Sequence, residues 1–139
     1  MSESESIENQ KEQFIFPNLG KEYGEFERVA EKYSLTSARE LITIARAGKL
    51  VTLSEDLWSQ LENTDSYHIN EDDFGQVAEF STMVNRDWES LKDKIVAGQE
   101  LDAPIVMKLQ GHYHVVSGNT RLMVARAAAI RPKVLLFEV

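Results

Sequence analysis

The hydrophobic period of this chain changes near residue 118, which limits the folds open to its C-terminal part. Residues 112–117 (HYHVVS) are β-branched and aromatic, as expected of a strand. After the following Gly-Asn-Thr, apolar residues recur at helical spacing, with Leu122, Ala125 and Ala129 in one row. The sequence therefore predicts a strand that turns at Gly118 directly into a helix.

The segments on either side extend this unit to a small sheet. Residues 104–109 (PIVMKL) are apolar and favour a strand, and Gln110-Gly111 suits a tight reversal, so a β-hairpin is predicted. Arg131-Pro132 is expected to stop the helix. Residues 133–139 (KVLLFEV) are apolar almost throughout, as in a strand covered on both faces. We expect an α/β (α+β) fold, a small mixed sheet with helices.

Three helices are predicted in the N-terminal half of the chain. Apolar spacings of three and four predict one over residues 23–33. Residues 37–40 (SARE) form a capping-box pattern and predict a second helix of about ten residues, for which Gly48 suits a left-handed cap. Residues 54–62 predict a third, capped by its serine. The last two could form a helix-turn-helix, but the acidic third helix disfavours contact with DNA.

Two further helices are expected between residues 70 and 98. Residues 70–73 (NEDD) can open one of them, although residues 77–84 fit either a helix or a strand. Asp87 is the predicted N-cap of a helix that extends to Val96, and Gly98 follows where a C-cap is expected.

Length and composition favour one domain with a tail. A chain of 139 residues is long enough for a single core. Residues 1–13 carry few apolar groups and are expected to be a disordered acidic tail. Residues 14–85 are expected to form a mainly helical region packed on a core of residues 86–139.

Charge and composition narrow the possible functions. The net charge is −8, yet residues 104–139 hold five Lys/Arg against one Glu, which favours a basic site there for a small phosphorylated ligand and disfavours general DNA binding. The chain has no cysteine, which excludes disulfides and thiolate metal sites and is compatible with a cytoplasmic location. The sequence has neither a membrane-spanning apolar run nor a secretory signal, so no membrane association is expected.

The predicted helix start has the composition of a phosphate site. Backbone N–H groups and the helix dipole favour an anion there, the glycine allows close approach, and an arginine fork suits phosphate oxygens. The predicted phosphate-binding residues are Ser117, Gly118, Asn119, Thr120 and Arg121. The alternative is purely structural: the glycine permits a tight turn, Asn119 or Ser117 caps the helix, and Arg121 is a solvated surface charge.

A family resemblance supports the phosphate interpretation. The order helix, Pro104-Ile-Val-Met, then residues 114–127 (HVVSGNTRLMVARA), then a final strand resembles the ParB/sulfiredoxin superfamily over about residues 86–139. In that superfamily a glycine-x-x-arginine motif, matched by Gly118 and Arg121, holds nucleotide phosphates. The resemblance implies ATP or CTP with Mg²⁺ as ligand, and this chain looks most like the stand-alone domains of bacteriophages and their bacterial hosts.

Departures from the family limit what it implies. Sulfiredoxins carry a cysteine inside the motif, so the cysteine-free chain is not expected to repair sulfinic acids. Partition proteins carry further motif residues, for which only Asn85-Arg86-Asp87 is a faint counterpart.

Several polar residues are accessory candidates. His112 and His114 lie two apart on a strand, so both should face one side, to contact a phosphate or simply solvent. Asp102, Asp87 and Glu138 are the carboxylates nearest the predicted site, Arg86 is a further candidate, and no catalytic residue or metal site is predicted.

Three functions remain open from the sequence. The leading one is a nucleotide-binding domain, with phosphoryl transfer or a nucleotide-gated switch as its activity. The second is a non-catalytic interaction module that binds a protein partner through the N-terminal helical half. The third, a DNA-associated partition-type protein, is disfavoured by the acidic charge.

Overall fold

The predicted hairpin and the strand that follows it form the centre of the sheet. The structure, a computed structural model, describes residues 13–139 except 63, 65, 67–68, 72 and 85–87. Strand β5 (Ile105–Leu109) pairs with the antiparallel strand β6 (His112–Ser117). Both turn residues have positive φ, 51° at Gln110 and 82° at Gly111, as a two-residue hairpin turn of the primed type requires.

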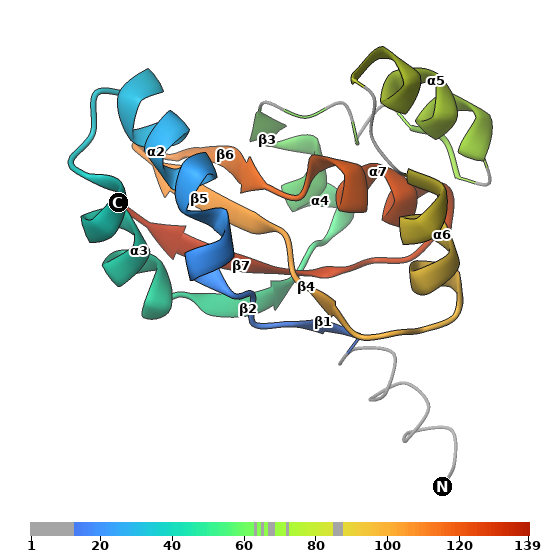
Figure 1. Ribbon diagram of the computed structural model, residues 1–139, viewed down its shortest axis with the longest axis horizontal. Coiled ribbons are helices and arrows are strands. Elements are labelled where there is room, and N and C mark those ends of the chain that lie inside the picture. Colours follow the sequence, from blue (N-terminus) through green and yellow to red (C-terminus); the bar gives the residue numbers. More distant parts are fainter. Residues whose placement is uncertain (1–12, 63, 65, 67–68, 72, 85–87) are drawn as a thin grey trace, which may run out of the picture.

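The five-stranded sheet has the order β2-β7-β5-β6-β3 (Figure 1). Strand β7 (Lys133–Glu138) runs parallel to β5 and antiparallel to β2 (Lys49–Thr52), so the prediction of an internal strand is confirmed. The other edge strand, β3 (Leu61–Glu62), is parallel to β6. The N-terminal half thus contributes both edges of the sheet, which the sequence pattern did not predict.

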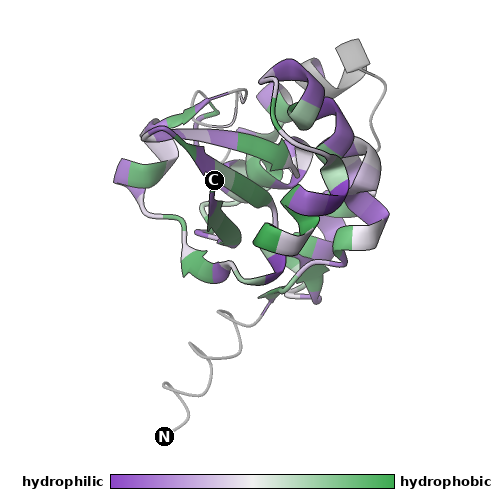
Figure 2. Ribbon diagram, turned by 90° about the vertical axis from the view of Figure 1, so that its left-hand side faces the viewer, coloured by the Kyte–Doolittle hydropathy of each residue, from purple (hydrophilic) through white to green (hydrophobic). Residues whose placement is uncertain are grey.

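Helices cover both faces of the sheet, and side-chain alternation decides which residue faces which layer. Ile105 and Met107 of β5 pack against α2 (Tyr23–Lys32) and α3 (Ala38–Arg46). Val106, which lies between them, packs on the opposite face against α7 (Asn119–Ala127). In Figure 2 the strands inside the molecule are mostly hydrophobic, and the outer helices carry hydrophilic residues. The sequence expectation of a mixed α/β fold is confirmed at this level.

Helices α2 and α3 follow the predictions except for two details of the α3 caps. Ser37 caps α3, since its hydroxyl accepts from the Glu40 N–H at 3.2 Å. The Glu40 carboxylate instead accepts from the Thr36 hydroxyl at 2.6 Å. Gly48 is not in the left-handed region. It is required because a Cβ there would lie 2.8 Å from the Leu136 carbonyl oxygen.

The helix-turn-helix that the sequence left possible is absent from the described part of this region. Helix α4 (Glu55–Ser59), capped by Ser54, is separated from α3 by strand β2, which belongs to the sheet. It also ends earlier than predicted, because Leu61–Glu62 pairs with β6 instead of continuing the helix. DNA recognition by this helix pair has no geometric basis.

The remaining helices lie together at one end of the sheet (Figure 1). Residues 77–84, ambiguous in sequence, belong to helix α5 (Phe74–Val84). Helix α6 (Trp88–Val96) is confirmed, with Gly98 at φ 74° after its end, while its predicted cap Asp87 lies outside the described residues. Helix α7 ends at Ala127, before the predicted Arg131-Pro132 stop.

The N-terminal segment joins the fold one residue earlier than predicted. Gln13 is buried and its side-chain amide donates to the Ile95 carbonyl at 2.9 Å, which places it in the fold rather than in the tail. The next residues form β1 (Phe14–Ile15), parallel to β4 (Leu101–Asp102), and a 3₁₀ turn η1 (Leu19–Glu22) leads into α2. In the described residues, no helix is long and apolar enough to cross a membrane.

Candidate functional site

The turn between β6 and α7 requires glycine for two structural reasons. Gly118 has φ 103°, a left-handed conformation that residues with a side chain adopt only with strain. A Cβ at this position would also lie 2.7 Å from the Cβ of Pro104. The fold alone therefore accounts for the glycine, as the structural alternative predicted. That alternative is wrong about the cap, because Gly118 itself is the N-cap and no side chain in the described structure caps the helix.

Arg121 is partly buried at the first turn of α7, and is not a solvated surface charge. Its side chain is 15% exposed. One terminal nitrogen donates to the Asp102 carbonyl oxygen. The other donates to Ser117 Oγ at 3.4 Å and lies 3.8 Å from Glu22 Oε1. The guanidinium thus has one firm contact with the backbone and two looser contacts beside it.

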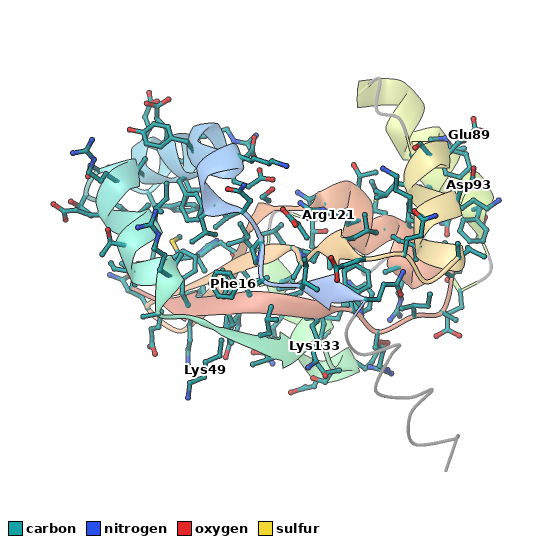
Figure 3. The ribbon with its side chains drawn as sticks, turned by 60° about the horizontal axis from the view of Figure 1, so that its bottom comes forward. Phe16, Lys49, Glu89, Asp93, Arg121 and Lys133 are labelled. Carbon is teal, nitrogen blue, oxygen red and sulfur yellow. The ribbon has the colours of Figure 1, made fainter. Side chains whose placement is uncertain are left out.

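A cleft of about 560 Å³ opens at the N-terminus of α7. Three cations line it from three different helices: Arg28 of α2, Lys94 of α6 and Arg121 of α7. All five predicted phosphate-binding residues, 117–121, are part of the lining. Figure 3 shows Arg121 between the N-terminal helices and α6, with Lys49 at a distant edge of the molecule.

Two carboxylates, Glu22 and Glu25, share the cleft with the three cations. Glu25 forms an ion pair with Arg28, and Glu22 Oε2 accepts from the Ser117 hydroxyl at 2.8 Å. Three cations against two carboxylates leave one positive charge, in a chain whose net charge is −8. Burial lowers the pKa of Arg121 from its ordinary value, and Glu22 and Asp102 oppose that shift. The cleft therefore carries a local positive balance in an acidic molecule, which suits an anion.

A smaller pocket of about 170 Å³ adjoins the cleft. It shares Arg28 and Asn119 with the cleft, and its other lining includes Lys32 and Tyr33 of the α2 region. The Asn119 Oδ1 atom is buried and has no hydrogen-bond partner among the described residues. The two pockets thus meet at a helix start whose first side chain has an unsatisfied acceptor.

The two predicted histidines lie on one side of β6, away from the cleft lining. Their ring centroids are 6.4 Å apart, which confirms the shared face. His112 is exposed and its Nδ1 lies 2.9 Å from Glu62 Oε2. His114 is only 6% exposed and its ring centroid is 4.5 Å from that of Tyr33. The solvent-facing interpretation is correct for His112 and wrong for His114.

Two of the three predicted carboxylates, Asp102 and Glu138, are not part of the described cleft lining. The Asp102 side chain accepts from the Asn18 N–H at 3.1 Å, and only its carbonyl reaches Arg121. Glu138 lies beside Lys108, near the opposite end of β5 from the Gly118 turn. Arg86 and Asp87 lie outside the described residues.

The cleft residues that come from other helices were not predicted from the sequence. Glu22, Glu25, Arg28 and Lys94 have no distinctive motif, and they approach the turn only because α2 and α6 pack beside it. The available sequence signal for an acidic neighbour was Arg121 in the first turn of α7. A cation at a helix N-terminus is unfavourable beside the helix dipole and is stabilised by an anion nearby.

The chain matches no protein-family model, no curated protein and no solved structure. The candidate site therefore depends on its own geometry and on the motif at Gly118 and Arg121.

Proposed function

We propose that the cleft at the start of α7 binds the phosphates of a small ligand, a nucleotide such as ATP or CTP with Mg²⁺. The observation that carries this proposal is the convergence of Arg28 of α2, Lys94 of α6 and Arg121 of α7 on one cleft at the N-terminus of α7. Arg28 and Arg121 each have a carboxylate neighbour, Glu25 and Glu22, whereas Lys94 forms no ion pair among the described residues, so its charge is available to an anion.

The first turn of α7 adds hydrogen-bond donors to this charge. A helix N-terminus presents backbone N–H groups that have no partner within the helix. Here Gly118 provides no side chain to cap them. The positive end of the helix dipole and the Arg121 guanidinium lie at the same place, which favours an oxyanion such as phosphate.

The dimensions and the donor set of the cleft suit a metal-bound nucleotide. A volume of about 560 Å³ falls within the range of about 300–1,000 Å³ common for small-molecule sites. Mg²⁺ is typically held by one or two carboxylates together with substrate phosphates. Glu22 is a carboxylate of this kind in the cleft lining, and Glu25, which is paired with Arg28, lies in the same lining, so the residues present fit the cation that the family resemblance implies.

The ParB/sulfiredoxin-like motif supports the same assignment from sequence. Gly118 and Arg121 have the glycine-x-x-arginine spacing that holds nucleotide phosphates in that superfamily. Members use the bound nucleotide either for phosphoryl transfer to a small acceptor or as a switch. We propose binding as the shared property, on which either activity of this chain would depend.

Calorimetric titration with ATP, CTP and ADP in the presence of Mg²⁺ tests the proposal. Lys94 is the best residue to change, because it forms no ion pair with any residue in the described part of the chain. We expect Lys94→Ala to weaken nucleotide binding about tenfold, as for the loss of one charged contact to phosphate. Lys49→Ala removes the same charge far from the cleft and should bind as the unmodified chain does.

Either of two results would contradict the proposal. The first is that none of the three nucleotides binds. The second is that Lys94→Ala and Lys49→Ala weaken binding equally, which would indicate a general charge effect rather than a site at α7.

A further inference from the structure

The Glu22 carboxylate holds the position that an anion in this cleft would need. Its Oε2 accepts from the Ser117 hydroxyl at 2.8 Å, and its Oε1 lies 3.8 Å from the Arg121 guanidinium. Ser117 and Arg121 are two of the predicted phosphate-binding residues, so a phosphate and this carboxylate compete for the same donors. The Glu22 side chain is 22% exposed and forms part of the cleft wall.

The charge on Glu22 opposes a bare phosphate even where the two do not overlap. Like charges a few ångströms apart repel strongly where water is partly excluded. The 3.8 Å separation from Arg121 also exceeds hydrogen-bond distance, so the arginine neutralises Glu22 only in part. A divalent cation between the carboxylate and the phosphate converts this repulsion into attraction.

We infer that Glu22 is a specificity residue of the cleft, which excludes metal-free polyphosphates and admits them as complexes with a divalent cation. This inference rests on the proposed function, since it concerns the ligand of the same site. It adds a residue from outside the glycine-x-x-arginine motif, and it assigns that residue a selective role. Glu25 is less suited to this role, because its carboxylate is already paired with Arg28.

Glu22→Gln is the variant that isolates the charge. The glutamine Oε1 can still accept from the Ser117 hydroxyl, so the local hydrogen bond is retained and thermal unfolding should be almost unchanged. Glu27→Gln is the matched control, because Glu27 is an exposed residue of the adjoining helix α2 and is not part of the cleft lining.

The experiment titrates ATP and CTP into the three proteins, with excess Mg²⁺ or with EDTA. We expect the unmodified chain and Glu27→Gln to bind at least about tenfold more tightly with Mg²⁺. Glu22→Gln should bind the metal-free nucleotide about tenfold more tightly than the unmodified chain does, and should lose most of the Mg²⁺ dependence.

The outcomes distinguish this inference from the proposed function. If nucleotides bind, but Glu22→Gln leaves the metal-free affinity unchanged or lowers it, the inference is wrong and the binding site remains. Equal binding with Mg²⁺ and with EDTA by the unmodified chain also overturns the inference alone. If neither nucleotide binds any of the proteins under either condition, both are wrong.

Discussion

Helix α7 carries two arginines whose surroundings differ sharply. Their side chains are almost equally exposed, 15% for Arg121 and 16% for Arg126. Arg126 is a clamp: both terminal nitrogens donate to the Glu55 carboxylate, Nε donates to the Ile69 carbonyl at 3.2 Å, and the guanidinium lies 5.2 Å from the centre of the Trp58 ring. These contacts fasten α4 and the following segment to α7.

Arg121, one and a half turns earlier on the same helix, has looser contacts and an open cleft beside it. Its ion-pair partner Glu22 lies 3.8 Å away, and the cleft adjoins its side chain. Burial and an acidic neighbour therefore do not by themselves assign an arginine to structure or to binding. The role of an arginine follows from how completely its guanidinium is hydrogen-bonded and from whether open space adjoins it.

The largest expected effect is at the turn that places Arg121. We expect Gly118→Ala to lower the free energy of unfolding by about 2–5 kcal/mol, through left-handed strain and overlap with Pro104. Urea-induced unfolding measures this change. Gly24→Ala is the control, because a Cβ at that helical position meets nothing within 4 Å. Equal stabilities for the two variants would show that the turn is not strained.

Replacing each of the two arginines by methionine should separate stability from binding. Arg126→Met removes the charged bond to the Ile69 carbonyl and should lower the free energy of unfolding by about 1.5–3 kcal/mol, with little effect on nucleotide affinity. Arg121→Met should cost only about 0.5–1.5 kcal/mol in stability, because its cation opposes the helix dipole, yet it should weaken binding at least tenfold. Unfolding and titration of both variants give the test. If the larger stability loss falls on Arg121, the assignment of roles is wrong.

Local patterns explain why one side of the candidate site was predictable. The hairpin, the Gly118 turn and the first turn of α7 are built from neighbouring residues, and their periodicity and turn chemistry are visible in the sequence. The cleft wall is different. Glu22 approaches Ser117 across 95 positions of the chain, and nothing in its own segment indicates that contact.

Long-range pairing also explains the parts of the fold that the sequence did not predict. Strand β2 is four residues long and lies between two helices, so it is defined by its antiparallel partner β7 rather than by a pattern of its own. Gly48 was assigned to a helix cap by its position, whereas the structure requires it for the close approach of the Leu136 carbonyl from that same strand pair. A contact with a strand near the C-terminus thus explains why position 48 is a glycine.

A weaker effect is expected in β6, where the buried polar groups of Ser117 and His114 differ in their hydrogen bonding. Ser117, at the end beside the cleft, has its hydroxyl bonded to Glu22, whereas the buried His114 Nδ1 has no partner among the described residues. Burial lowers the pKa of His114, with Glu62 opposing the shift and His112 and Lys32 adding to it. The unfolded chain, with an ordinary histidine pKa of about 6.5, therefore binds the proton more readily than the folded chain does.

It follows that His114 contributes stability that is present above about pH 6.5 and is lost as the pH falls through the lower pKa of the folded state. We expect the unmodified chain to lose more stability on acidification from neutral pH than His114→Gln does, as measured by urea unfolding at a series of pH values. His112→Gln, at the exposed neighbouring position, should follow the unmodified chain. If the free energy of unfolding depends on pH in the same way for all three proteins, the buried His114 imidazole does not cause that dependence. His114 would then contribute no more to it than the exposed His112 does.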